Sequence, residues 1–359
     1  MASFRTSPAD EAETDRLLAS ALQTHQAHLA ASTAEMTTLL AGLVRGETAI
    51  EDVIAVVGGS VLPRWHFEML NDLERSEAYS VALERRVRPG SLVLDIGSGT
   101  GLLALMAARA GAGQVVTCEA NPLLAQIARG IIARAGMSHR ITVVPKFSTD
   151  LVVGVDLPRR ADLIVSEIVD CGLVGEGLLP TVAHARDVLL APGGDLLPAR
   201  CVLHGTVVSS PALYGLNHVE SVAGFDIRLL NLVASRRHVP VRAWDRPFHQ
   251  LTAPSALLAL ELLDGKPDDP TATVELTADL DGPAHGLLVW FEMDLGSGVT
   301  ITNAPDNRSS HWEQAFVPFP SPVRVTAGDQ LSVTLCADDL RLSASLSASP
   351  ANDFVRSAP

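Results

Sequence analysis

Between Val61 and about Pro198, short apolar runs alternate along the chain with longer segments of helical spacing. The apolar runs are SLVLDIG, QVVTCEA, ITVVPK and ADLIVSEIV, and the segments between them include LLALMAARAG and PLLAQIARGIIARAG. Short β-rich runs that alternate with helices of about ten residues or more indicate βαβ units on a parallel sheet. The pattern therefore predicts an α/β region whose ligand binds at the carboxyl edge of the sheet.

Beyond Pro198 the pattern changes to apolar runs without long helical segments. RCVLHGTVV, ALLALELL, ATVELTADL, GLLVWFEMDL, VRVTAG and QLSVTLCA are separated by breaks rich in Gly, Pro and Asp, whereas TVAHARDVLL, just before the turn APGG, still has helical spacing. This second half is predicted to be an antiparallel β domain or barrel. The final segment, SASLSASPANDFVRSAP, is expected to be frayed.

Helical spacing also appears before the α/β region, from about Pro8 to Val57. We predict two helices in a small hairpin that ends near Gly58 and Gly59 and serves either as a cap on the next domain or as a dimerisation element. The apolar positions of the two helices are Leu17, Leu18, Leu22, Leu39, Leu40, Leu43 and Val44. The predicted domains are a helical region at residues 1–58, a cofactor-binding domain at 59–198 and a β domain at 199–359.

Composition narrows the range of partners. The 359 residues are 47% hydrophobic and 19% charged, which is typical of a globular interior, and the net charge of −14 argues against a nucleic-acid groove. The four cysteines are scattered without a CxxC spacing, so neither a disulfide framework nor a metal site is predicted, and a reducing cytoplasm is favoured. We find no signal peptide and no apolar run long enough to span a membrane.

The first apolar run of the α/β region leads into a glycine-rich loop, Asp95-Ile96-Gly97-Ser98-Gly99-Thr100-Gly101. Glycines at Gly97, Gly99 and Gly101 allow a sharp turn and let a ligand approach bare backbone. A nicotinamide dinucleotide fold has the spacing GxGxxG, whereas this loop has GxGxG. Asp95 would repel phosphates and suits an ammonium group, so the loop favours S-adenosyl-L-methionine as the cofactor.

Two further groups belong to the predicted cofactor site. Glu119 ends the second apolar run about 20 residues on, where an acid accepts hydrogen bonds from the two ribose hydroxyls. A dinucleotide fold shares this feature, so Glu119 does not discriminate between the two cofactors. Lys146, Phe147 and Ser148 follow the third run and are predicted to border the adenine.

Two glutamates, Glu167 and Glu176, stand nine positions apart in ADLIVSEIVDCGLVGEGLLPT, beyond the glycine-rich loop. Gly175 and Gly177 flank Glu176, as a tight turn requires. Paired carboxylates match the guanidinium of arginine, which is planar, stays protonated and offers donors in a bidentate fork. The pair therefore predicts an enzyme that binds arginine and aims one of its nitrogens at the methyl group of the cofactor.

These motifs resemble the protein arginine methyltransferases from about Leu62 to about residue 339. The segment RWHFEMLNDLERSEAY resembles the family's helix over the cofactor, SEIVDCGLVGEG its double-glutamate hairpin, and Ser310-His311-Trp312 its Thr-His-Trp loop. The resemblance implies a Rossmann-like class I methyltransferase domain followed by a β-barrel-like domain. It also implies that the glutamate pair is catalytic.

The resemblance assigns further roles residue by residue. His66 and Met69 would lie against the methionine part of the cofactor, and Arg75 would bind its carboxylate. Asp72 would orient its neighbours and, with His311, could accept the proton released after transfer, as could either glutamate. Trp312 would form one wall of the arginine pocket and limit the size of a methylated guanidine.

The sequence leaves the acceptor open between two kinds of arginine. PKFSTDLVVG and SEIVDCGLVGEGLLP look most like the monomethylating and symmetric-dimethylating branch of the family, and a monomethylated product is favoured. We favour free L-arginine in a bacterial biosynthetic pathway, of the type that supplies methylarginine to a nitrosourea antibiotic. Arginine in a polypeptide is the alternative. It is less favoured because no recognition module for a polypeptide is evident.

The sequence also bears on two alternative classes of protein and on the oligomeric state. An inactive methyltransferase-fold scaffold is disfavoured because both glutamates and the His-Trp pair are present, and a nicotinamide oxidoreductase is disfavoured by the loop spacing. PALYGLNHVESVAGFDIRLLN resembles a shortened dimer arm of the family, so a homodimer is expected. Neither a nucleic acid nor a membrane is expected as a partner.

Overall fold

The computed structural model describes residues 8–45, 49, 56, 58–59, 62–234, 238–264, 270–338 and 340–350. The chain divides into two compact units, residues 1–67 and 68–359. None of the described helices is both long and apolar enough to cross a membrane. All four cysteines of the chain are free.

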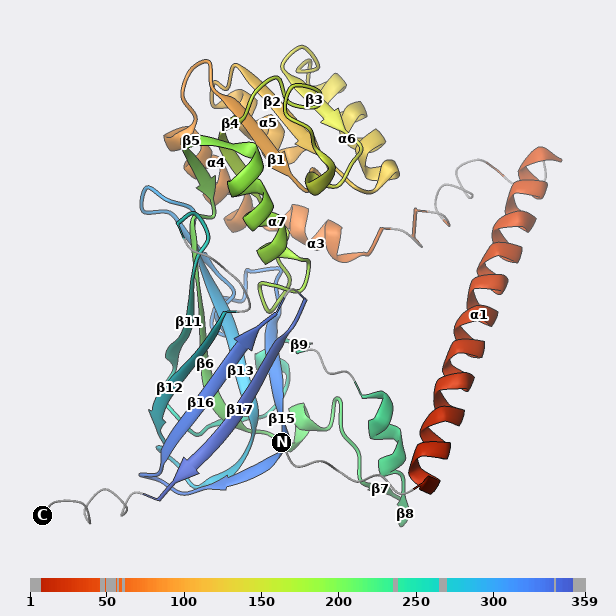
Figure 1. Ribbon diagram of the computed structural model, residues 1–359, viewed down its shortest axis with the longest axis vertical. Coiled ribbons are helices and arrows are strands. Elements are labelled where there is room, and N and C mark those ends of the chain that lie inside the picture. Colours follow the sequence, from red (N-terminus) through yellow and green to blue (C-terminus); the bar gives the residue numbers. More distant parts are fainter. Residues whose placement is uncertain are drawn as a thin grey trace, which may run out of the picture. The chain divides into compact units, whose positions relative to one another are not determined.

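In the first unit, both predicted helices lie within α1, a continuous helix of 37 residues at Pro8–Val44 (Figure 1). The predicted hairpin of two helices is therefore wrong. Neither glycine nor proline occurs between Ala9 and Ala41, and alanine is frequent there, so nothing in this stretch interrupts the helical hydrogen bonds. Most of the predicted end of the region, between residues 46 and 61, lies outside the described residues.

The second unit begins with a five-stranded parallel sheet in the order β3-β2-β1-β4-β5 (Figure 1). The predicted α/β architecture is confirmed. The chain runs outward from β1 to β3 and then returns to β4 on the other side of β1, so a crevice forms outside the carboxyl ends of β1 and β4. The strands are β1 at Leu92–Ile96, β2 at Gln114–Cys118, β3 at Ile141–Val144, β4 at Ala161–Ser166 and β5 at Leu190–Leu197.

Helices cover this sheet, and its strands consist mainly of apolar residues because they are buried beneath those helices. Every residue of β1 is buried, which is typical of a parallel strand covered on both faces. Within α4, Tyr79 and Leu83 are fully buried, and the hydroxyl of Tyr79 donates to the carbonyl of Ser166 at 3.3 Å, at the carboxyl end of β4. The helical elements are α3 at Trp65–Asn71, α4 at Leu73–Arg86, α5 at Leu102–Arg109, α6 at Pro122–Arg134, η1 at Ser148–Asp150, α7 at Leu178–His184 and η2 at Ala185–Leu189.

The predicted turn APGG lies inside β5 as a bulge. The pairing of β4 with β5 moves from Ala161 opposite Leu190 to Leu163 opposite Asp195, so the residues between them leave the ladder. β5 ends at Leu197, and the next strand, β6, begins at Arg200. The predicted boundary at residue 198 falls between these two strands, and the division into three domains stays a prediction.

The remaining strands form antiparallel sheets, which confirms the predicted β domain. β6 and β13 lie at the centre of a seven-stranded sheet ordered β10-β6-β13-β15-β9, in which β11 also pairs with β6 and β14 with β13. A second sheet has the order β12-β16-β17. The bounds are β6 Arg200–Ser209, β9 Val239–Val241, β10 His249–Gln250, β11 Ser255–Glu261, β12 Thr271–Thr277, β13 Gly282–Asp294, β14 Thr300–Thr302, β15 Gln314–Val325, β16 Gln330–Ala337, β17 Leu342–Ser349 and the turn η4 Ala243–Asp245.

The last strand corrects the prediction of a frayed tail. β17 covers all of SASLSAS and pairs with β16 along its whole length. The segment alternates small polar residues with Ala344, Leu346 and Ala348, which pack against the core, so it has the period of two that a strand requires. Residues 351–359 lie outside the described residues.

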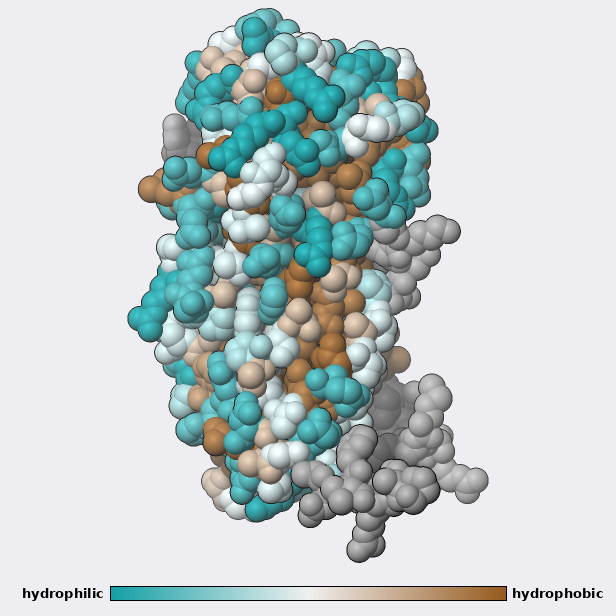
Figure 2. Space-filling view, turned by 90° about the vertical axis from the view of Figure 1, so that its left-hand side faces the viewer, coloured by the Kyte–Doolittle hydropathy of each residue, from teal (hydrophilic) through white to brown (hydrophobic). Residues whose placement is uncertain are grey.

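An extension between β6 and β9, which we call the arm segment (residues 211–233), contains short elements. They are α8 at Pro211–Tyr214, β7 at Ser221–Val222, β8 at Phe225–Asp226 and η3 at Arg228–Val233. On the face of the molecule shown in Figure 2, hydrophilic residues dominate the α/β part, whereas a hydrophobic stripe runs down the β domain. The exposed apolar residues of the arm segment are Leu216, Val222, Phe225, Leu229, Leu230 and Leu232.

Candidate active site

The glycine-rich loop joins β1 to α5 in a conformation that favours glycine. Gly97, Gly99 and Gly101 have φ angles of 83°, 51° and 81°, in the left-handed region. A Cβ at Gly97 would lie 2.7 Å from a side-chain carbon of Ile168, whereas a Cβ at Gly99 would meet nothing within 4 Å. The loop therefore packs closely against the segment after β4 and leaves open space beside the backbone of Gly99.

Asp95, on β1 just before this loop, is completely buried. Its Oδ2 accepts a hydrogen bond from the hydroxyl of Thr117 at 2.8 Å, whereas its Oδ1 has no well-formed hydrogen bond. Burial raises the pKa of Asp95 to about 6, although the hydrogen bond from Thr117 opposes the rise. An N–H or ammonium group next to Oδ1 would satisfy the carboxylate.

Glu119, which follows β2, is oriented by the backbone. Its Oε2 accepts the N–H of Gly99 at 2.9 Å, and its Oε1 accepts the N–H of Asn121 at 2.8 Å. Each carboxylate oxygen has further acceptor capacity, which suits it to hydroxyl donors. The structure thus brings Glu119 to the glycine-rich loop, and its predicted contact with the ribose hydroxyls stays a prediction.

The residues after β3 lie in three different environments. Lys146 forms an ion pair with Asp156, at 2.9 Å, so its ammonium group is already engaged. Phe147 is 66% exposed, and Ser148 is buried at the start of η1. An exposed aromatic ring at the carboxyl edge of the sheet is the kind of surface on which a flat base packs.

Arg75 and Glu167 form a buried ion pair between α4 and the end of β4. Their side chains are 3% and 5% exposed. Glu167 is therefore partly neutralised by a residue of the protein, and the structure does not leave it as a bare carboxylate. Burial lowers the pKa of Arg75, and its Nε and Nη1 have no hydrogen-bond partner, so the guanidinium has capacity for one more anion.

Asp72 joins α4 to the loop before β15. Its Oδ1 caps α4 by accepting the N–H of Arg75, and its Oδ2 accepts both the N–H and the Nδ1–H of His311 at 2.9 Å. Burial favours the neutral acid, but these hydrogen bonds outweigh it and lower the pKa of Asp72. Burial also lowers the pKa of His311, so its imidazole is neutral at pH 7 and its Nε2 is free to take a proton.

Glu176 lies in the turn between β4 and α7. Its side chain is exposed, yet desolvation by the surrounding protein raises its pKa to about 7. The negative charge of Asp170 adds to the rise. Glu167 does not contribute to this shift, because its charge is paired with Arg75.

The β domain contacts the segment that carries both glutamates. Trp312 is buried, and its Nε1–H donates to the carbonyl of Val169 at 3.1 Å. Asn303, which the sequence did not suggest, donates to the carbonyls of Cys171 at 3.2 Å and Glu313 at 2.6 Å. These bonds fix the start of the turn to the β domain. The predicted role of Trp312 as a wall of the arginine pocket stays a prediction.

His66 and Met69 both belong to α3, and the division of the chain into two units, after residue 67, falls between them. The Nδ1–H of His66 donates to the carbonyl of Pro63 at 3.0 Å, and its ring stacks on Trp65 with 3.8 Å between centroids. Met69 belongs to the second unit and is half-buried. Their predicted contact with the cofactor stays a prediction.

Three residues that the sequence did not single out lie in the predicted site segments or contact them: Ser98, Asp170 and His238. Ser98 lies in the loop and has a buried hydroxyl without a partner. Asp170 and His238 form a hydrogen bond 2.6 Å long between residues 68 positions apart. A serine within the loop could have been noticed, but no local pattern marks His238.

Among the buried side chains with unsatisfied polar atoms, Arg75 and Asp95 are complementary to the two charges of an amino acid. Arg75 offers two buried N–H groups to a carboxylate, and Asp95 offers a buried oxygen to an ammonium group. An amino acid moiety provides both charges. Together with Glu119 beside the open backbone of Gly99, this donor and acceptor set fits S-adenosyl-L-methionine.

Comparison with known proteins agrees with this geometry. The family model described as the arginine methyltransferase oligomerization subdomain matches residues 203–345, and that of the ribosomal protein L11 methyltransferase matches residues 80–185. The chain is 50% identical over 295 residues to the arginine N(omega)-methyltransferase of Streptomyces achromogenes subsp. streptozoticus, covering 82% of each chain. It is 32% identical over 256 residues to the protein arginine N-methyltransferase 7 of Oryza sativa subsp. indica, covering 66% of this chain and 36% of that relative.

Solved structures share the fold. The PRMT1 enzyme-prozyme complex of Trypanosoma brucei with AdoHcy superposes with a TM-score of 0.68 at 24% identity, covering 80% of this chain and 94% of that one. Protein arginine methyltransferase 10 of Arabidopsis thaliana gives a TM-score of 0.64 at 20% identity, covering 80% and 93%. The fold is thus that of a class I methyltransferase with a β domain. On the similarity to the Streptomyces enzyme, the chain belongs to the arginine methyltransferase family.

Proposed function

We propose that this chain transfers the methyl group of S-adenosyl-L-methionine to a guanidinium nitrogen of free L-arginine and gives N-omega-monomethyl-L-arginine. The observation that carries the proposal is the pair of glutamates on one short segment after β4, at the carboxyl edge of the parallel sheet. The name of the Streptomyces relative, an arginine N(omega)-methyltransferase, supports arginine as the acceptor. A free acceptor suits the synthesis of a small product, as in antibiotic biosynthesis.

The cofactor supplies an electrophilic methyl group on a sulfonium when it is bound. In the proposed arrangement the free N–H groups of Arg75 hold its carboxylate, Asp95 faces its ammonium group and Glu119 accepts its ribose hydroxyls. The other residues proposed to bind it are His66, Met69, Gly97, Gly99, Gly101, Lys146, Phe147 and Ser148. Because Lys146 is paired with Asp156, any role for it lies in shaping the border of the site.

The guanidinium of arginine is a poor nucleophile because its lone pair is delocalised. Glu167 and Glu176 are proposed to bind its edges, draw positive charge towards themselves and aim one nitrogen in line with the methyl group. Arg75 moderates the charge of Glu167, so Glu176 supplies the larger part of the new charge interaction. After transfer, Nε2 of His311 can take the proton, and Asp72 holds the ring in the tautomer that allows it.

The raised pKa of Glu176 predicts a pH dependence. A carboxyl with a pKa of about 7 is protonated below that pH, so it loses the charge that binds guanidinium. We expect kcat/KM for arginine to fall by about tenfold per pH unit below pH 7 and to level off above it. Initial rates measured across this pH range give the acidic limb of the kcat/KM profile. A profile that stays flat through pH 7 would contradict the assignment of Glu176 as the ionised partner.

Mass spectrometry after incubation with S-adenosyl-L-methionine separates the two acceptors. Free arginine should gain one methyl group, whereas an arginine- and glycine-rich peptide should stay unmodified. Methylation of the peptide alone would reject the free acceptor and favour the alternative, a protein arginine methyltransferase, which the similarity to the rice relative supports. Cofactor binding in calorimetry without either product would indicate the inactive scaffold.

We also propose a homodimer that uses the arm segment. Its exposed apolar side chains include Phe225 at 72% and Leu230 at 60%, and such a cluster on one extension is typical of a protein interface. The matching oligomerization subdomain includes these residues. The proposed location is the cytoplasm, which suits four free cysteines and a diffusible cofactor.

A further inference from the structure

We propose that His238, acting through Asp170, is a positioning residue that holds the turn carrying Glu176 in the orientation needed for arginine. The inference rests on the proposed function of Glu176. It depends on contacts between the turn and the β domain.

The turn from Asp170 to Gly177 is built around the side chain of Asp170. Its Oδ1 accepts the N–H of Gly172 at 3.1 Å and the N–H of Gly175 at 2.9 Å. Its carbonyl accepts the N–H of Leu173 at 3.0 Å. One carboxylate thus organises the backbone up to the residue before Glu176, in the manner of an Asx turn.

The glycines of the turn are required by the two side chains beneath it. A Cβ at Gly175 would lie 2.0 Å from Oδ2 of Asp170, and a Cβ at Gly172 would lie 2.6 Å from Nε2 of His238. No side chain fits at either place without moving the pair. Leu173 has a φ of 74°, which a residue with a Cβ rarely adopts and which surrounding contacts must hold.

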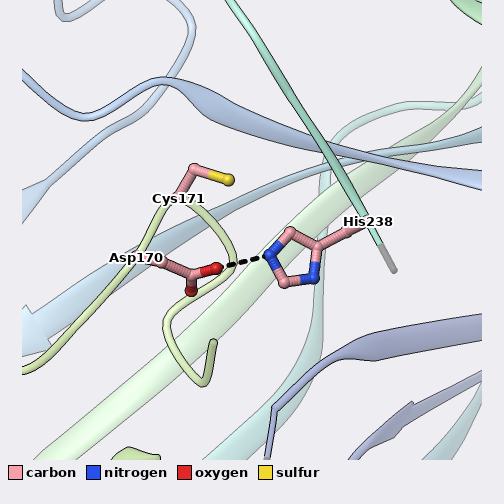
Figure 3. A group of neighbouring side chains, drawn as sticks. All are labelled: Asp170, Cys171 and His238. Carbon is pink, nitrogen blue, oxygen red and sulfur yellow. Dashed lines mark hydrogen bonds and ion pairs between the residues drawn. The ribbon is translucent and has the colours of Figure 1, made fainter. Parts of the chain in front are cut away.

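His238 reaches the turn from the β domain (Figure 3). It is buried, and its Nε2 lies 2.6 Å from Oδ2 of Asp170. Its Nδ1 accepts the backbone N–H of Leu342, at the start of β17, at 3.2 Å. A ring nitrogen that accepts carries no proton, so the proton is on Nε2 and is donated to Asp170. The backbone of β17 therefore sets the tautomer that holds Asp170.

The same residues could be taken for a metal site. Ligand atoms of Asp170, Cys171 and His238 lie within 4.8 Å of one another. A metal on Nε2 would require the proton of a neutral imidazole to sit on Nδ1, where it would face the N–H of Leu342. Burial also raises the pKa of Cys171 well above its ordinary value, so its thiol stays protonated. The hydrogen-bonded arrangement is favoured over a metal.

Replacing His238 by leucine and by glutamine tests the link. Leucine removes the donor, whereas the amide of glutamine can place an N–H near the position of Nε2. For His238→Leu we expect kcat with arginine to fall about 10- to 100-fold, the loss expected from misplaced reacting groups, with the dissociation constant of the cofactor within about twofold of wild type. His238→Gln should recover most of kcat.

His285→Leu is the matched control. His285 is equally buried in the β domain and accepts the N–H of Ser210 on its Nδ1 at 3.1 Å. Its loss should lower thermal stability like that of His238 without a comparable fall in kcat. A wild-type value of kcat in a folded His238→Leu variant would overturn the proposal. Recovery of kcat in His238→Leu on addition of Zn²⁺, or inactivation of the wild-type enzyme by a chelator, would also overturn it, because either result implies a metal.

Two measurements separate positioning from a general structural role. Desolvation is the largest cause of the raised pKa of Glu176, and Asp170→Asn removes the negative charge that adds to it, so the acid limb of kcat/KM should move to lower pH; an unmoved limb would count against the link. Hydrogen exchange of the Gly172 and Gly175 amides should accelerate in His238→Leu, whatever the acceptor is, and unchanged exchange would contradict the proposal. A wild-type enzyme that does not methylate arginine would reject the proposed function alone.

Discussion

Glu176→Gln is expected to lower kcat with arginine by about 10³-fold and to leave the affinity for S-adenosyl-L-methionine unchanged. The amide keeps the shape of the side chain but cannot draw positive charge from the guanidinium. Because the pKa of Glu176 is raised to about 7, part of the free enzyme carries a protonated carboxyl at neutral pH, and bound arginine restores the ionised form. Initial rates and calorimetry on the same preparation give the two quantities.

Glu275→Gln serves as the control for this result. Glu275 is exposed on β12, so the same chemical change there should leave kcat unaltered. Normal turnover in Glu176→Gln, with the cofactor bound as tightly as in wild type, would remove the carboxylate pair from the mechanism. The acid limb near pH 7 should also vanish in this variant, because the group that causes it is gone.

Arg75→Met is expected to destabilise the fold by about 3 kcal/mol, because it leaves the carboxylate of Glu167 buried without its partner. The two side chains are 3% and 5% exposed, so water cannot replace the lost interaction. The affinity for the cofactor should fall as well, since the N–H groups proposed to hold its carboxylate disappear. Urea unfolding followed by circular dichroism measures the first effect, and calorimetry measures the second.

A second variant distinguishes the loss of a pair from the loss of packing. Adding Glu167→Gln to Arg75→Met removes the stranded charge, so part of the stability should return although activity stays low. Arg200→Met is the exposed counterpart, because Arg200 and Glu261 are paired with 45% and 55% exposure, and its cost should be below about 1 kcal/mol. Equal losses in Arg75→Met and Arg200→Met would contradict the importance of burial.

The local sequence was sufficient to predict most of the elements of the α/β part. The strand and helix periods, the glycine-rich loop and the two glutamates depend on neighbours in the chain, and the parallel sheet brings their ends together at one edge. Two local predictions failed for opposite reasons. The hairpin became the single helix α1 because no residue breaks it, whereas the expected frayed tail became β17 because β16 offered a complete partner.

The pairing of residues in the site could not be predicted in this way. Asp72 contacts His311 across 239 positions, and Glu167 pairs with Arg75, which the resemblance assigned to the carboxylate of the cofactor. His238 has no local signal at all, since its role follows from the tautomer that the backbone of β17 imposes.

Periodicity, glycine spacing and residue type were enough to predict the fold class, the cofactor and the chemical nature of the acceptor. The pairing of charges, the donors left without a partner and the raised pKa of Glu176 follow from the three-dimensional arrangement. The reason is that hydrogen-bond partners and desolvation depend on how the α/β and β parts pack, and neither is a property of residues that are adjacent in the chain.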